Sequence, residues 1–399
     1  MDFQITEDQK RLQGHCQELA ADFATRSAEH DREGTHPSEN YEILREEGFC
    51  ALNVPERLGG AGLGLLSHTL AFEALGQGCP STALSFNMHL SITGPLMESA
   101  EVSEDTKQMV AELVVRDRKL IAGNFSEPSS TGLIGERPLS TRARQVPGGY
   151  SITGRKMFAS MLEAADYCAV LTYPDAATSA TAALFLLVPR IADGRSVIAN
   201  WDTLGMRATR SDSLILEECW VPESAAVFQT DDFRTMRLEF ASWFWASYTP
   251  VYLGVGIAAY NEVLKVLKER QPLGYSQSLA YHPDVRRHVA KMSVDLQAAR
   301  LMTYHSAWLR DTEGPTPETL AALFRAKYMV GEVVGSVTRT ALTLGGAHNI
   351  FRGSRLEQLF RDGALAPIQT PPSDFCLYNV GLFELGLDAM DVVPPLKPL

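Results

Sequence analysis

The stretch STRARQVPGGYSITGRKMFAS at residues 140–160 contains a β-hairpin signal in the middle of the chain. Its PGGY segment at 147–150 separates two short runs of the kind that form strands. Similar runs, punctuated by Pro, Gly and Asn, surround it between residues 120 and 228. We therefore predict a β-rich module here, either a sandwich or a small barrel. No long helical segments alternate with these runs, which argues against a doubly wound Rossmann sheet.

Helical patterns flank this module on both sides. Residues 1–115 read mainly as helix, with apolar residues at helical spacing. Longer helical stretches follow at 240–270, 282–311 and 316–346, each with a sustained apolar stripe typical of a packed bundle. The fold class is thus α+β and mostly α. The predicted domains are an N-terminal helical domain at 1–119, a β domain at 120–229 and a C-terminal helical bundle at 230–399.

The composition excludes several classes of function. A net charge of −12 and the lack of long basic runs argue against a nucleic-acid partner. The apolar runs are too short to span a bilayer, and the acidic start MDFQITEDQKRL does not resemble a signal peptide. Six scattered cysteines without a CxxC pair predict reduced thiols and no metal site. We expect a cytoplasmic enzyme.

Five segments, in this order along the chain, resemble motifs of the acyl-CoA dehydrogenase superfamily of flavoproteins. They are FSEP at 125–128, GYSITGRKMFAS at 149–160, LGMRATRSDSLILEECWVP at 204–222, ERQPLG at 269–274 and LGGAHNIFRGSRLEQLFRDG at 344–363. Each segment alone is a weak signal. Their order and spacing on a helix–β–helix background imply the family fold, in which a four-helix bundle forms the C-terminal domain.

The resemblance implies a site for FAD. Phe125 and Ser126 match the turn that offers backbone N–H groups and a hydroxyl to the flavin ring. Phe158 stands where the family carries a tryptophan that packs on the ring, and Ser160 where it carries a threonine that hydrogen-bonds to it. Arg270 matches an arginine that contacts the FAD pyrophosphate, usually that of a second subunit. Gly345 and Gly346 match a turn that lets the backbone approach the ADP half of FAD.

Each of these residues also has an ordinary structural interpretation. Phe158 could be a strand core residue, and Arg270 a charge that complements the dipole at a helix C-terminus. Gly345 and Gly346 could simply end a helix. The joint occurrence of the motifs favours FAD binding.

The chain departs from the family at the catalytic base. Family members remove a proton next to a thioester with a glutamate, while a hydride leaves the β-carbon for flavin N5. In most members this glutamate follows the Arg-Asp pair, which here places Thr370 at its position. A minority carry the base on the first helix of the bundle, where this chain has Phe244 and Trp245. None of these three side chains can take up a proton.

Three other side chains could supply acid–base chemistry. Glu239 lies just before Phe244, Asp374 lies just after Thr370, and His89 lies on a helix that could line the cavity. Structural roles compete with each: a solvated helix face for Glu239, a helix N-cap for Asp374, and a hydrogen-bonded core position for His89. The sequence also leaves open whether any side chain acts as the catalytic base.

An aromatic stripe at helical spacing marks the first helix of the bundle. It consists of Phe240, Trp243, Phe244, Tyr248 and Tyr252. Such a stripe could be a bundle core or could wall the space above the flavin, where it would favour a compact or aromatic substrate. The residues expected to line a substrate cavity are Phe244, Trp245, Tyr248 and His89.

The leading functional hypothesis is FAD-dependent α,β-dehydrogenation of an acyl thioester bound to CoA or to a carrier protein. The missing glutamate keeps open a flavin monooxygenase or a non-oxidative lyase on the same fold, and a non-catalytic protein is a third hypothesis. The resemblance further implies a homotetramer or homodimer. The sequence does not identify the electron acceptor.

Overall fold

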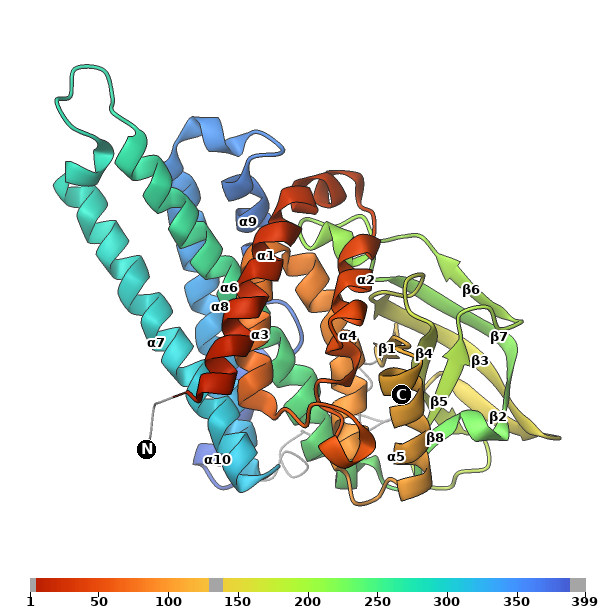
Figure 1. The fold of residues 1–399 in the computed structure, drawn as a ribbon. Helices are drawn as coiled ribbons and strands as arrows, with labels where there is room; N and C mark the ends of the chain where they lie inside the picture. The colour runs from red at the N-terminus through yellow and green to blue at the C-terminus, as the bar shows by residue number, and fades with distance from the viewer. Residues whose placement is uncertain (1–4, 129–138, 388–399) are drawn as a thin grey trace, which may run out of the picture. The chain divides into compact units, whose positions relative to one another are not determined.

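The computed structural model describes residues 5–128 and 139–387 (Figure 1). The chain folds into two compact units. The bundle unit comprises Met1–Ala28, Leu65–Pro80 and Trp245–Leu399, and the sheet unit comprises Glu29–Gly64 and Ser81–Phe244. The domain limits drawn from the sequence stay predictions. The expectation about a signal peptide rests partly on residues 1–4, which lie outside the described residues.

Three long helices of the bundle unit coincide with the three stretches predicted from the sequence. They are α6 (Arg237–Glu269), which begins in the sheet unit, α7 (Pro283–Glu313) and α8 (Pro317–Gly345). Helices α7 and α8 lie side by side (Figure 1). The unit also contains most of α1 (Glu7–Glu33), with α3 (Leu65–Gly78), α9 (Arg355–Ala364) and α10 (Ser373–Glu384). The predicted helical bundle is confirmed.

The ends of α8 follow directly from its sequence. Thr316 accepts a hydrogen bond from the Thr319 N–H at 3.2 Å, and the Thr319 hydroxyl oxygen accepts one from the Thr316 N–H at 2.9 Å. This reciprocal capping satisfies donors that a helix start leaves free, and Pro317 fits the first turn because it lacks an N–H. Gly346, at φ 78°, ends the helix in the left-handed region.

Two glycines allow the backbones of α3 and α6 to touch. A Cβ atom on Gly76 would lie 2.6 Å from the Val251 carbonyl oxygen, and one on Gly254 would lie 2.5 Å from the Glu73 carbonyl oxygen. Both distances are shorter than a van der Waals contact. Side chains at these two positions would therefore force the helices apart.

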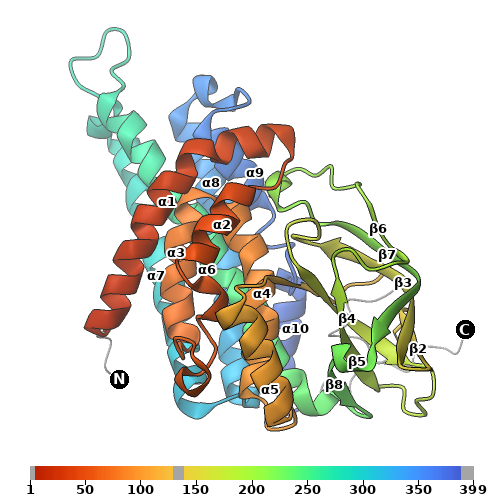
Figure 2. The ribbon, with the colours of Figure 1, turned by 45° about the vertical axis from the view of Figure 1, so that its right-hand side comes forward.

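The sheet unit is built around eight strands in the order β6-β7-β3-β2-β4-β5-β8, with β1 paired to β4 (Figure 2). They are β1 (Ile121–Asn124), β2 (Arg142–Val146), β3 (Gly149–Ala159), β4 (Tyr167–Pro174), β5 (Ala183–Pro189), β6 (Arg195–Ile198), β7 (Asp212–Pro222) and β8 (Ala226–Thr230). The unit also contains α2 (Ser38–Glu46), α5 (Glu104–Ala111) and nearly all of α4 (Pro80–Glu98). Strands β2 and β3 pair antiparallel on either side of Pro147 and Gly148, so the predicted hairpin is confirmed.

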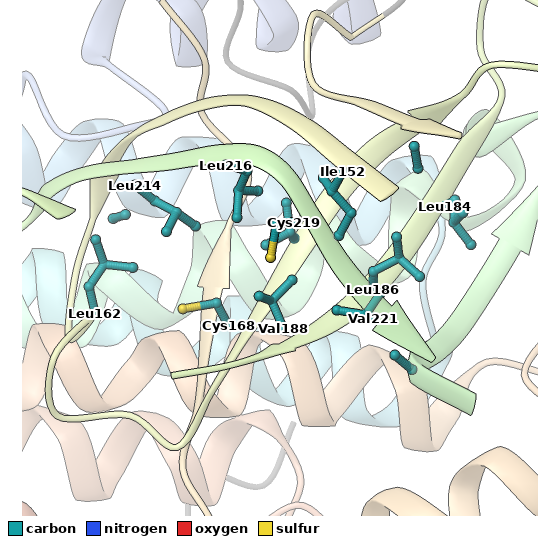
Figure 3. Close-up of a cluster of buried hydrophobic side chains, with 14 residues drawn as sticks. Ile152, Leu162, Cys168, Leu184, Leu186, Val188, Leu214, Leu216, Cys219 and Val221 are labelled. Carbon is teal, nitrogen blue, oxygen red and sulfur yellow. The ribbon is translucent and has the colours of Figure 1, made fainter. Parts of the chain in front are cut away.

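An apolar core of the sheet unit lies against β3, β4, β5 and β7 (Figure 3). Ile152, Leu186, Leu214 and Val221 meet there with the side chains of Cys168 and Cys219. Strands β4 and β5 are buried along most of their length, which explains their continuous apolar sequences. All six cysteines of the chain are buried, and none of them forms a disulfide. No helix in the described part of the chain has the length and apolar character needed to cross a bilayer.

Replacing Gly254 by alanine should lower the free energy of unfolding by about 1–3 kcal/mol, because the new Cβ collides with the backbone of α3. Gly335→Ala is the matched control, since Gly335 lies inside α8 and an added Cβ there would have no neighbouring atom within 4 Å. That change should raise the free energy of unfolding by about 0.5–1 kcal/mol. Urea denaturation measures both, and equal effects would contradict the close helix crossing.

Candidate active site

A completely buried ion pair fixes the FSEP turn. Lys156 Nζ of β3 lies 2.7 Å from Glu127 Oε1, and neither side chain has exposed surface. Lys156 also donates to the Phe125 carbonyl oxygen at 3.4 Å. The Glu127 carboxylate accepts hydrogen bonds from the Ser140 N–H and hydroxyl, both at 2.6 Å, and from the Thr141 N–H at 2.9 Å. The turn is therefore tied to β3 and to the residues that precede β2.

The environment keeps both members of this pair charged at neutral pH. Burial by itself would raise the pKa of Glu127, but the Lys156 charge and the hydrogen bonds outweigh burial and lower that pKa to about 2. Burial lowers the pKa of Lys156 to about 8, against the opposing influence of Glu127. A buried charge pair with this many hydrogen bonds holds one geometry, because any displacement leaves a charge uncompensated.

Phe158, next to this pair on β3, is unusual in both backbone and exposure. Its φ of 53° lies in the left-handed region, where residues with a Cβ are strained. The pairing of β3 with β7 shifts register between Lys156 and Ala159, which places Phe158 in the irregularity. The ring is 60% exposed and lies edge-on to Trp201, with ring centroids 6.1 Å apart. Strained backbone positions of this kind cluster at ligand sites, which makes Phe158 a candidate contact for a ligand.

A row of buried hydroxyl groups begins two residues further on. Ser160 Oγ lies 2.6 Å from Ser211 Oγ, which lies 2.8 Å from Thr209 Oγ1. The Thr209 hydroxyl donates to the Met206 carbonyl oxygen at 2.9 Å, and the Trp201 indole N–H donates to the same oxygen at 3.0 Å. The sequence singled out Ser160 and missed the other members, although they lie in or beside the LGMRATRSDS segment.

The bundle unit brings together the other expected cofactor residues. Arg270, exposed at the end of α6, donates to the Gly345 carbonyl oxygen at 3.2 Å. A Cβ on Gly346, which has a φ of 78°, would lie 2.3 Å from Arg270 Nη1, so a side chain there would displace the guanidinium group. The guanidinium group thus lies against the turn that follows α8, and its exposed donors are available to an anion.

Thr370 lies half-buried in the connection between α9 and α10. The buried Lys327 of α8 donates to the Ala366 carbonyl oxygen at 2.8 Å, and Ser373 donates to Glu332 Oε1 at 2.8 Å. Burial lowers the pKa of Lys327 to about 8. The connection that carries Thr370 is therefore held on both sides by polar side chains of α8.

Aromatic packing surrounds the alternative base position on α6. In the sheet unit, the Phe244 ring lies 4.7 Å from the Phe125 ring. In the bundle unit, the Trp245 ring lies 5.3 Å from Phe324 of α8 and 5.8 Å from Phe375 of α10. Tyr248 follows on α6 and is also buried, and burial raises its pKa.

The three candidate bases differ in environment. Glu239 lies in the first turn of α6 and is half-buried, whereas Asp374 lies in the first turn of α10 and is exposed. His89 is fully buried, with Nδ1 accepting from the Ile121 N–H at 2.9 Å and Nε2 bonded to the Cys50 carbonyl oxygen at 2.8 Å. Burial lowers the His89 pKa to about 4. This arrangement uses both ring nitrogens and favours a structural role for His89.

Comparison with known proteins identifies the family. Residues 6–113 match the acyl-CoA dehydrogenase N-terminal domain, and residues 247–370 match the C-terminal domain. The chain is 30% identical over 357 residues to the putative acyl-CoA dehydrogenase YdbM of Bacillus subtilis, covering 89% of this chain and 91% of that protein. The chain belongs to the acyl-CoA dehydrogenase superfamily, as the sequence motifs predicted, and it is therefore a flavoenzyme.

Solved structures share the fold. The glutaryl-CoA dehydrogenase–glutaryl-CoA complex superposes with a TM-score of 0.86 at 20% identity, over 97% of this chain and 98% of that one. The FAD complex of PigA superposes with a TM-score of 0.83 at 19% identity, over 97% of this chain and all of that one. The order of helical domain, β domain and helical bundle predicted from the sequence is confirmed.

Replacing Glu127 by glutamine should lower the free energy of unfolding by about 3–5 kcal/mol, because the Lys156 ammonium group is left buried without its counter-charge. The double variant Glu127→Gln, Lys156→Met should be more stable than Glu127→Gln alone. Urea denaturation of the variants measures this coupling. Additive effects of the two changes would contradict the pairing.

The pair also predicts acid sensitivity. The pKa of Glu127 is about 2 in the folded protein and near 4.5 in an unfolded chain. The ionised carboxylate therefore stabilises the fold above pH 4.5, and that contribution is lost as the pH falls from about 4.5 towards 2. Thermal melts across this range should show a shallower loss of stability for Glu127→Gln than for the wild type. If the wild type and Glu127→Gln lost stability equally as the pH fell, Glu127 would not be the source of the acid sensitivity.

Proposed function

We propose that the protein is an FAD-dependent dehydrogenase that forms an α,β double bond in an acyl thioester bound to CoA or to a carrier protein. The observation that carries the proposal is the strained, exposed Phe158 beside the Ser160 hydroxyl row, on the strand that the buried Lys156–Glu127 pair fixes. The 30% identity to a putative acyl-CoA dehydrogenase supports the same reaction class. The electron acceptor is not part of the proposal.

The residues present fit FAD. Phe158 offers an exposed aromatic ring on which a flavin can pack. The half-buried Ser126, which follows the buried Phe125 in the turn beside β3, carries the hydroxyl group that we propose for a ring edge. Arg270 suits the pyrophosphate of FAD, and the turn at Gly345 and Gly346 suits its ADP half. In this family the pyrophosphate contacted by this arginine usually belongs to the FAD of a second subunit. When bound, FAD accepts the hydride that leaves the substrate β-carbon.

Because Arg270 is expected to contact the FAD of a second subunit, we also propose that the protein is a homotetramer or homodimer. We propose that it acts in the cytoplasm.

Proton removal at the α-carbon needs a different group from the usual glutamate. We propose Glu239 as that base, because it is half-buried in the first turn of α6, the helix on which a minority of the family carries the base. Asp374 is the second candidate and is less suited because it is exposed. Phe244, Trp245 and Tyr248 are proposed to form the apolar wall of the substrate site.

One observation favours a second function. Thr370, Phe244 and Trp245 occupy both family positions for the base, and none of them can accept the α-proton. Oxidation of a substrate by reduced flavin and O₂, or non-oxidative cleavage of a thioester, would need no such base. These reactions are the alternative to dehydrogenation.

Anaerobic titration with a panel of acyl-CoAs distinguishes these functions. Dehydrogenation predicts bleaching of the bound flavin by at least one acyl-CoA, with the rate reduced about 10²–10⁴-fold in Glu239→Ala. Glu262→Ala is the control, because Glu262 lies on the same helix and pairs with Lys265.

Three outcomes would change the conclusion. Bleaching that survives in Glu239→Ala but is lost in Asp374→Ala would move the base to Asp374. Absence of bleaching with every acyl-CoA would reject the dehydrogenase. Rapid O₂ consumption by the reduced enzyme with substrate would then favour oxygen-dependent oxidation.

A further inference from the structure

Trp201 lies beside Phe158 but belongs to a different segment, the connection between β6 and β7. Its ring meets the Phe158 ring at 87°, with the ring centroids 6.1 Å apart. Aromatic pairs favour this perpendicular arrangement, because the positive edge of one ring meets the negative face of the other. Trp201 is half-buried, whereas Phe158 stays 60% exposed beside it. The contact therefore restrains the Phe158 ring without covering it.

The backbone around Phe158 gives its ring little support. The paired residues of β3 and β7 shift register between Lys156 and Ala159, so Phe158 has no regular cross-strand partner. A largely exposed side chain at such a position can move between rotamers, and a ligand that binds it must then restrict this freedom. A neighbouring ring that already restricts it lowers the entropy lost on binding.

Trp201 is itself anchored through both its side chain and its backbone. The indole N–H donates to the Met206 carbonyl oxygen at 3.0 Å, and the backbone N–H donates to Asp212 Oδ1 at 2.8 Å. The Asp212 side chain is buried, and Oδ1 also accepts from the Asn200 N–H at 2.7 Å. Because these bonds fix Trp201 independently of Phe158, Trp201 sets the position of the Phe158 ring.

We infer that Trp201 is a positioning residue that holds the ring of Phe158 in one orientation, ready for a planar ligand to stack on it. This inference rests on the proposed function, which makes that ligand the flavin ring of FAD. The contact with the flavin belongs to Phe158, and Trp201 acts through it.

A double-mutant cycle on the affinity for FAD tests this order of action. Release of FAD from the intact protein on dilution, followed by flavin fluorescence, measures the affinity. Trp201→Ala should weaken FAD binding about two- to tenfold, the size expected for one edge-to-face ring contact. Trp201→Phe keeps an aromatic edge and should lie closer to the wild type. In the Phe158→Leu background, Trp201→Ala should cause no further loss, because the ring that Trp201 holds is gone.

Two spectroscopic measurements separate positioning from a general loss of stability. With FAD saturating, the visible circular dichroism of the bound flavin should change in Trp201→Ala, because the ring under the flavin is no longer fixed. In flavin-free protein, NMR of the Phe158 ring should show a ring-current shift that Trp201→Ala removes. Trp220→Ala is the matched control, since Trp220 is a half-exposed tryptophan on β7, and it should change neither affinity nor spectra.

Three results would overturn the inference. They are unchanged affinity and dichroism in Trp201→Ala, additive losses in the double-mutant cycle, and a Phe158 ring shift that survives Trp201→Ala. A wild-type protein that binds no flavin would instead reject the proposed function. The NMR measurement needs no flavin, so it would still decide whether Trp201 holds the Phe158 ring.

Discussion

The buried pair of Glu127 and Lys156 is the constraint on which the proposed flavin site depends. Taking two charges out of water is costly. Here the cost is offset by the pair itself, by hydrogen bonds that Ser140 and Thr141 donate to Glu127, and by the one that Lys156 donates to the Phe125 carbonyl oxygen. These contacts lock the FSEP turn to β3. Phe158 and Ser160 continue the same strand segment, so their positions follow from the pair.

Regular structure could be predicted from the sequence because its signals are local. The hairpin at 147–150 and the bounds of α8 depend on turn residues, caps and apolar spacing within a few residues of one another. The Glu127–Lys156 pair could not be predicted in this way, although both residues lie in the quoted motifs. The two residues lie far apart in the sequence, and only the folded sheet brings them together.

The same limit applies to the site. Ser160 could be selected by resemblance, but its hydrogen-bonded neighbours could not, because Ser211 and Thr209 approach it only through the pairing of β3 and β7. The exposure of Phe158 could not be predicted from the neighbouring sequence either, since an aromatic residue in a strand is usually buried. His89 shows the opposite case, because its two backbone hydrogen bonds favour the structural role weighed from the sequence.

On the proposed assignment, the chain keeps most of the family motifs where a flavin would bind and departs from them where the base would act. This division implies that cofactor geometry and substrate chemistry are set by separate parts of the sequence. A crystal structure of the protein with flavin bound tests the central claim most directly. The account predicts the flavin ring against Phe158, with an edge of the ring within hydrogen-bond distance of Ser160 Oγ. A flavin bound elsewhere, or turned so that its polar edge points away from Ser160, would contradict it.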